Sequence, residues 1–165
     1  MLLFSVPIIL LYVVSQVQAS PCETTDIRFL YQCVDQHNEL RRNAGISSRV
    51  DYDPKMQSFA RVRAQKAASG KLIPLNESDC ILENSAFVPS VNETISCRHQ
   101  VSSWFHKSQN DKISKAPVHV QLSSSKSAIL LEEYTRIGCA RFMVEEPVIG
   151  SYIVCNYGLS SGMAC

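Results

Sequence analysis

The sequence lacks an excess of charge of either sign. Its 165 residues include 16 Lys and Arg against 15 Asp and Glu, a formal net charge of +1 at pH 7. Proteins that bind nucleic acid concentrate basic residues to neutralise phosphates, so this balance gives no indication of a nucleic-acid partner. We therefore interpret the basic residues of Arg61–Lys71 as a solvated helix face.

Long apolar runs are missing after residue 14, so we expect no later segment to cross a bilayer. Met1–Val14 is apolar, but it is shorter than the roughly 18 residues that a spanning helix needs, and Pro7 interrupts it. No basic residue follows Met1, yet Val17 and Ala19 are the small residues that a signal peptidase reads. We predict a signal peptide over residues 1–19 and one secreted domain over 20–165, long enough for a hydrophobic core.

Signatures of catalysis are also missing. No serine or cysteine stands in a nucleophile elbow or beside a recognisable oxyanion motif. Cys97 and His99 could suggest a thiol nucleophile with its base, but a cysteine of a secreted chain is more often a disulfide partner. We predict that the protein is not an enzyme.

Cysteines are plentiful, and all of them lie in the predicted secreted part, where an oxidising compartment favours disulfides. Seven is an odd number, so at least one thiol is free or pairs between chains, which would allow a disulfide-linked dimer of an otherwise monomeric protein. Cys165, at the end of the chain, is expected to pair with Cys22 or Cys33 or to remain free. The seven are Cys22, Cys33, Cys80, Cys97, Cys139, Cys155 and Cys165.

Two sequons, at Asn76 and Asn92, agree with a secreted chain and predict exposed, glycosylated positions.

Two early segments have the apolar period and the caps of amphipathic helices. The first starts after Thr25 and stops at Gly45, and the second has Asp53 as its cap, Pro54 at its first position and Gly70 at its end. Their apolar stripes comprise Ile27, Leu30, Val34, His37 and Arg41 in the first helix, and Met56, Phe59, Ala60, Ala64 and Ala67 in the second.

The later part of the chain is less regular. Lys71–Pro89 has no period and predicts a loop with at most a short strand near its CILE sequence. We expect a third helix from Ser90 to about Ser108, a short helix before Tyr134, and antiparallel strands over Thr135–Val144 and Gly150–Tyr157. Helices first and a strand pair last predict an α+β domain.

The strand pair leaves the pairing of Cys139 open. Cys139 lies opposite Cys155 or one residue out of register, so a direct bond is not excluded. A bridge from Cys139 to Cys80 would constrain a far longer segment and stabilise by roughly 3–4 kcal/mol on the chain-entropy model. We predict the Cys80–Cys139 pair and assign no partner to Cys155.

Six motifs stand in the order of a known family: Gln36–Arg42 (QHNELRR), Tyr52–Ala68, Leu82–Phe87 (LENSAF), Trp104, Thr135–Phe142 (TRIGCARF) and Tyr152–Gly158 (YIVCNYG). Together they resemble the CAP superfamily of cysteine-rich secretory proteins, venom antigens and pathogenesis-related proteins. The resemblance implies an α–β–α sandwich, with a three-stranded antiparallel sheet between helical layers.

The resemblance also implies a cavity with two histidines and two glutamates that can hold a divalent cation, but most of this tetrad is missing. Glu83 matches one glutamate, Lys107 stands where the second belongs, and Ser125 stands where one histidine belongs. The segment between Cys80 and Glu83 is too short for the other histidine. We predict a vestigial cavity with no metal and no other cofactor, because hard cations need several converging donors.

The remaining histidines do not replace the tetrad. His99 and His106 are two helical turns apart, too distant to chelate one ion without further ligands. His37 is interpreted as a helix-face or buried hydrogen-bonding residue.

What remains is function by binding, as a venom allergen-like modulator of an extracellular protein or of host immunity. The polar segments Lys71–Pro89 and Ser108–Pro117 would suit contact with a protein target. Alternatively, the protein carries a sterol or fatty acid in a slot between elements, although apolar stripes are more often core. The stripes that could line such a slot are Met56, Phe59 and Ala60, and Val101, Trp104 and Phe105.

Overall fold

The computed structural model describes residues 21–71, 73, 75, 80–89, 96–110, 128–145 and 148–160. Its elements, in chain order, are β1 (Cys22–Glu23), α1 (Ile27–Asn43), β2 (Asp51–Tyr52), α2 (Pro54–Ala68), β3 (Ile81–Pro89), α3 (Cys97–Asn110), the 3₁₀ turn η2 (Ala128–Leu130), β4 (Tyr134–Val144) and β5 (Gly150–Leu159).

The first two helices form where the sequence predicts them, because their caps satisfy the amides of the first turn. Asp26 accepts a hydrogen bond of 2.7 Å from the amide of Phe29 in α1, and Asp53 accepts one of 2.9 Å from the amide of Met56 in α2. Gly45 and Gly70 follow the two helices with φ of 77° and 65°, the left-handed conformation that ends a helix.

The predicted burial of two residues in the apolar stripes is wrong. Ile27 is exposed at the first position of α1, and Phe59 is exposed on α2. The stripe of α2 is narrower than predicted and consists largely of its alanines, which let the helix approach the sheet closely.

The sheet contains five strands in the part of the chain that the structure describes, not the three predicted. Its three long strands are antiparallel, with β5 between β4 and β3, and β1 and β2 both pair with β4. β1 is antiparallel to β4 and β2 is parallel to it. Each of these added strands has only two residues, which is too short for an alternating pattern to be recognised.

The segment predicted as a loop ends in a nine-residue strand, β3, which pairs with β5 along its whole length. The period of the strand was hidden because three consecutive polar residues, Glu83, Asn84 and Ser85, occupy its centre. Two of them, Glu83 and Ser85, are nevertheless buried.

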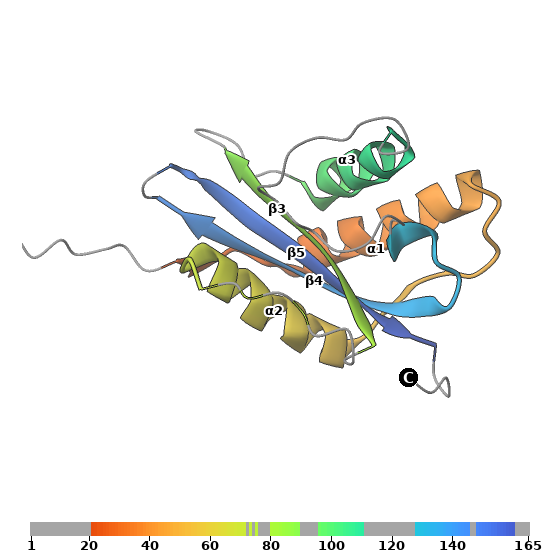
Figure 1. Ribbon diagram of the computed structural model, residues 1–165, viewed down its shortest axis with the longest axis horizontal. Helices are drawn as coiled ribbons and strands as arrows, with labels where there is room; N and C mark the ends of the chain where they lie inside the picture. Colours follow the sequence, from red (N-terminus) through yellow and green to blue (C-terminus); the bar gives the residue numbers. More distant parts are fainter. Residues whose placement is uncertain are drawn as a thin grey trace, which may run out of the picture.

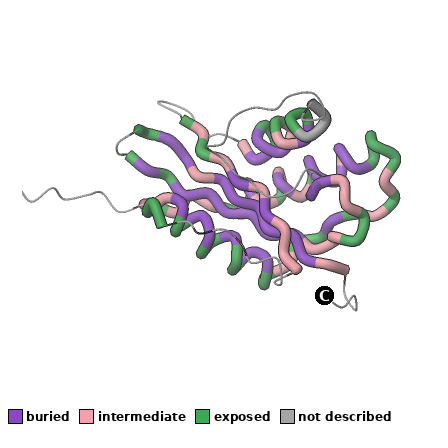
Figure 2. Tube along the Cα trace, in the orientation of Figure 1, coloured by how far each residue is buried: buried purple, intermediate pink, exposed green. Residues whose placement is uncertain are grey.

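The helices form layers on both faces of this sheet. Helix α2 packs on β4 and β5 from one side, whereas α1, with α3 packed against it, lies on the other (Figure 1). Buried residues follow the inner sides of the helices and the middle of the long strands (Figure 2). The α–β–α layer order implied by the resemblance is therefore present.

Alternate residues of β4 face the two layers. Gly138 faces α2, and a Cβ atom at this glycine would lie 2.0 Å from the backbone nitrogen of Gln57. Ile137 and Cys139 point the other way, into the larger core cluster that contains residues of α1 and α3.

The third helix begins, within the described residues, at Cys97. The Oγ of Ser96 accepts a hydrogen bond of 3.3 Å from the amide of His99, which caps this first turn. The predicted start at Ser90 lies outside the described residues. Of the short helix predicted before Tyr134, the described part is η2.

The predicted Cys80–Cys139 disulfide is wrong. Cys139 bonds Cys155, which stands directly opposite it across β4 and β5 with a Cα–Cα distance of 4.1 Å. Cys80 is in a disulfide as well, but with another partner. The gain from closing a longer loop did not decide the pairing, because a disulfide forms only between cysteines that the fold brings within about 7 Å.

A second disulfide joins Cys33 of α1 to Cys97 of α3. Cys97 is thus a disulfide partner, as predicted, and Cys33 is not available to Cys165, which itself lies outside the described residues. Among the described cysteines, Cys22 carries a free and exposed thiol.

Candidate functional site

Glu83, the residue that matches the tetrad, lies on β3 and faces α2. Its carboxylate forms a two-pronged ion pair with Arg63, with Nε–Oε2 and Nη2–Oε1 distances of 2.6 and 2.9 Å. The side chains of Arg63 and Glu83 are only 9% and 4% exposed, so solvent does little to screen their attraction. The charge of Glu83 is therefore compensated by an arginine of the same chain.

Arg63 corrects the interpretation of Arg61–Lys71 as a solvated face. Arg61 and Lys66 are exposed, but Arg63 is buried beside Ala60, Ala64 and Ala67. Its position three residues after Ala60 and four before Ala67 placed it on the apolar stripe. From this spacing the burial of Arg63 could have been predicted, and with it the need for a buried acidic partner.

Asn156 of β5 also lies beside Glu83. Its Nδ2 donates to Oε2 of Glu83 at 3.2 Å, and its Oδ1 is buried without a hydrogen-bond partner among the described residues. One amide oxygen beside a carboxylate already bound by Arg63 is a poor donor set for a divalent cation. The residues present do not fit the tetrad metal.

Of the other tetrad positions, the one that the structure describes lies away from Glu83. Lys107 is exposed on α3, in the layer on the opposite face of the sheet from Arg63. Ser125 lies outside the described residues.

Within the described ranges, the one group of side chains with metal-ligating spacing consists of Cys33, Cys97, Cys139 and Cys155, whose sulfurs all lie within 4.8 Å of one another. All four are buried and engaged in the two disulfides. A thiolate is the form that binds metal, so these sulfurs serve packing and covalent linkage in the oxidised protein.

Three residues of the QHNELRR motif, His37, Asn38 and Arg41, form hydrogen bonds to distant parts of the chain. The imidazole of His37 hydrogen-bonds the hydroxyl of Tyr157, and Asn38 donates to the carbonyl of Val50 and accepts from its amide. The guanidinium of Arg41 donates to four backbone carbonyls, those of Ser48, Ile129, Leu131 and Tyr134. The motif therefore connects α1 to η2 and β4.

His37 lies at the centre of a hydrogen-bonded chain in which both it and Tyr157 are fully buried. Its Nδ1 donates to the carbonyl of Cys33 at 2.7 Å, because a carbonyl can only accept, and its Nε2 then accepts from the hydroxyl of Tyr157 at 2.8 Å. The oxygen of Tyr157 accepts in turn from the amide of Asn84 at 2.9 Å. The chain is complete with every member neutral.

Burial favours this neutral arrangement. It lowers the pKa of His37 to about 4 and raises the pKa of Tyr157 well above its ordinary value. Neither His37 nor Tyr157 reaches solvent, and within the described residues this network connects α1, β3 and β5. His99 and His106 are both exposed on α3.

The two stripes proposed to line a lipid slot lie on opposite faces of the sheet. Met56 and Ala60 are buried between α2 and the sheet, while Val101 and Phe105 belong to the core beneath α1 and α3, with Trp104 packed against it. They cannot line a common slot.

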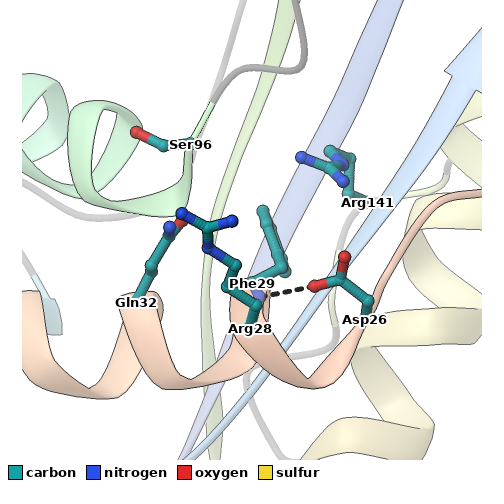
Figure 3. Close-up of a pocket in the computed structure, with 6 residues that line it drawn as sticks. All are labelled: Asp26, Arg28, Phe29, Gln32, Ser96 and Arg141. Atoms are coloured by element: carbon teal, nitrogen blue, oxygen red, sulfur yellow. Dashed lines mark hydrogen bonds between the residues drawn. The ribbon is translucent and has the colours of Figure 1, made fainter.

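A cavity of about 380 Å³ opens between the start of α1, the start of α3 and β4 (Figure 3). Its wall on the β4 side is formed by Arg141, whose Nε and Nη2 donate to Thr24 and whose guanidinium lies 4.7 Å from the ring centroid of Phe29. No pattern in the sequence predicts this cavity. Its lining residues are Asp26, Arg28, Phe29, Gln32, Ser96 and Arg141.

Several predicted positions fall outside the described residues. These are both sequons, at Asn76 and Asn92, and parts of the two polar segments proposed to contact a target, namely residues 72, 74 and 76–79 of the first and residues 111–117 of the second. Within the described residues, no helix is long and apolar enough to span a membrane.

The family model of the cysteine-rich secretory proteins, CAP, matches residues 34–157 of the chain. No curated protein sequence matches it. Among solved structures, hookworm platelet inhibitor is similar with a TM-score of 0.57 and 19% identity, covering 92% of this chain and 78% of that one.

Two further structures share the fold. Venom allergen-like protein 4 of Schistosoma mansoni has a TM-score of 0.56 and 15% identity over 79% of this chain and 88% of its own. An outer surface protein of Borrelia burgdorferi has a TM-score of 0.54 and 15% identity over 85% of this chain and 99% of its own. At such identities the likeness concerns the fold alone.

Proposed function

The chain belongs to the CAP family of cysteine-rich secretory proteins, and from this premise we propose that it is a secreted protein that acts by binding an extracellular target, without catalysis and without a metal in its vestigial cavity. The target class is an extracellular protein, including receptors of host immune cells or platelets.

The observation that carries this proposal is the buried pair of Arg63 and Glu83. In the family's tetrad, carboxylates and imidazoles converge to hold a cation. Here a fixed internal cation, the guanidinium, already neutralises the matching carboxylate, so a divalent ion would have to displace a buried ion pair. The lack of a nucleophile, base and orienting group in contact with one another, among the described residues, supports a non-enzymatic role.

The names of two similar proteins fit this role. Hookworm platelet inhibitor is named for the inhibition of platelets, and the schistosome protein is a venom allergen-like protein. A predicted signal peptide, two sequons and two disulfides within a small domain support action outside the cell.

Carriage of a sterol or fatty acid is the competing function. The separation of the two apolar stripes onto opposite faces of the sheet favours the target-binding role over this alternative.

Native mass spectrometry of the secreted, deglycosylated protein separates the two. We expect the mass of the polypeptide alone, whereas added sterol or fatty acid masses would establish carriage instead. Metal analysis of the same sample after dialysis should find no stoichiometric zinc; one zinc per chain would contradict the vestigial cavity.

Target binding is tested directly on cells. We expect the fluorescently labelled protein to bind leukocytes or platelets saturably and to be displaced by excess unlabelled protein. The matched control is the same protein after reduction and alkylation, which removes the disulfides. Binding that fails to saturate on either cell type, or that the control reproduces, would overturn the cellular target.

A further inference from the structure

The cavity between α1, α3 and β4 has no part in the proposed binding of a protein target, and its lining brings polar, charged and aromatic side chains together. It combines two guanidiniums, a carboxylate, an amide, a hydroxyl and an aromatic ring. Sites of this kind are concave and apolar at the base, with a few polar groups that fix the ligand's orientation.

On the β4 side of the cavity, the side chain of Arg141 is held by hydrogen bonds and its positive charge is compensated. The guanidinium of Arg141 is 5% exposed and is held by the hydroxyl and the carbonyl of Thr24 at 2.9 and 2.7 Å. Burial lowers its pKa, and the nearby negative charge of Asp26 acts in the opposite direction. Asp26 therefore neutralises this side of the cavity, and Oδ1 of Asp26 is occupied in capping α1.

The opposite side carries an uncompensated positive charge. Arg28 is exposed, and it makes no hydrogen bond or ion pair with any residue that the structure describes. Gln32 lies one helical turn further along α1, and Ser96 lines the cavity at the start of α3 (Figure 3). The five N–H donors of Arg28 are thus available to an oxyanion, beside two further polar side chains.

Between the two sides lies an apolar base. The ring of Phe29 projects between Arg28 and Arg141 and is itself buried (Figure 3). A cavity of about 380 Å³ suits a ligand of the size of one sugar ring with its substituents rather than a lipid chain or a peptide.

We propose that this cavity binds an acidic sugar unit, a hydroxylated ring that carries a carboxylate or sulfate. The oxyanion binds Arg28, Gln32 and Ser96, the ring lies against Phe29, and hydroxyl groups donate to the carboxylate of Asp26. The separation of a positive and a negative side within one cavity is the reason for this choice, because a bare anion would be repelled by Asp26 and a neutral sugar would leave Arg28 unused.

A titration followed by the amide signals of ¹⁵N-labelled protein tests the site, with glucuronic acid and glucose 6-sulfate as ligands and glucose and inorganic sulfate as controls. We expect saturable shifts at Phe29, Gln32 and Ser96 with the two acidic sugars. Arg28→Gln should weaken binding about tenfold, because it removes the charge-assisted hydrogen bonds and keeps an amide. The matched control is Arg42→Gln, which removes an equal charge from the far end of the same helix and should leave the affinity within about twofold.

If the two variants lost affinity for the acidic sugars equally, the cause would be long-range electrostatic attraction and the proposed site would be wrong. Shifts that cluster away from these residues, or no saturable binding, would overturn it as well. Inorganic sulfate that binds as tightly as glucose 6-sulfate would overturn the recognition of the sugar. None of these outcomes bears on the cellular target, which is measured separately.

Discussion

At the scale of single residues, Arg63 and Glu83 show how strongly a buried charge depends on its partner. Arg63→Met leaves the Glu83 carboxylate buried without compensation and should lower the free energy of unfolding by about 3–5 kcal/mol. The double variant Arg63→Met with Glu83→Gln removes both charges and should recover much of this loss. Urea denaturation of the three proteins at pH 7 measures both effects.

Arg61→Met is the matched control for this prediction. Arg61 lies two residues earlier on α2 and pairs with Glu23 at 2.7 Å, but its side chain is 57% exposed. An exposed pair contributes at most about 1 kcal/mol. If Arg61→Met and Arg63→Met were equally destabilising, burial would not be the cause.

His37 makes the stability of the protein depend on pH. Burial lowers its pKa from 6.5 to about 4, so the unfolded chain takes up a proton between these values while the folded protein does not. Stability is therefore fully present above pH 6.5 and decreases as the pH falls towards 4. We expect a loss of about 2 kcal/mol between pH 7 and pH 5, measured by denaturation at each pH.

The exposed His99 provides the comparison. His99→Gln should leave the dependence on pH unchanged, and His37→Gln should flatten it between pH 7 and pH 5. An unchanged slope in His37→Gln would show that other groups cause the loss.

At the scale of elements, the Cys33–Cys97 and Cys139–Cys155 disulfides connect different parts of the fold. Cys33–Cys97 ties α1 to α3 across a sequence separation of 64, whereas Cys139–Cys155 joins two strands that the ladder already holds, across a separation of 16. On the chain-entropy model, replacing the first pair by alanines should cost about 4 kcal/mol and replacing the second about 3 kcal/mol. Denaturation under non-reducing conditions compares the two double variants.

Both double variants exchange buried cysteines for the same residue, so each serves as a control for the other. A larger loss for Cys139→Ala with Cys155→Ala would mean that the cross-strand bond contributes more than loop closure, through packing beneath α1 and α3.

The sequence predicts those helices and strands whose caps, turns and apolar periods lie within the element itself. The helices α1 and α2 have caps and periods of their own, and the β4–β5 pair has a turn and apolar residues within a short stretch. β3 gave no such signal, because its polar centre is stabilised by distant partners: Arg63 of α2 for Glu83, and Tyr157 of β5 for Asn84. A strand of this kind becomes evident only when its neighbours are in place.

At the scale of the whole molecule, the free thiol of Cys22 provides a route to a covalent dimer. It is exposed on β1, at the edge of the sheet. We expect the protein to be a monomer in reducing buffer and to form a disulfide-linked dimer on mild oxidation, because an accessible thiol can pair between chains. Cys22→Ser should stay monomeric, as seen by non-reducing electrophoresis and size-exclusion chromatography.

A dimer that persists in Cys22→Ser would place the contact elsewhere. The exposed ion pair of Arg98 and Glu39 allows a surface control, since Arg98→Gln on α3 should leave the oxidised dimer intact.

The sequence by itself determined the family, the α+β class and the caps of two helices, because these depend on residues close together in the chain or on motifs that can be read in order. Only the tertiary structure decided the partner of Cys139, the burial of Arg63 against Glu83 and the cavity beside Phe29. Each of these joins side chains from elements far apart in sequence. Strand register and the close approach of the helices to the sheet bring them together, and neither is encoded in any single segment.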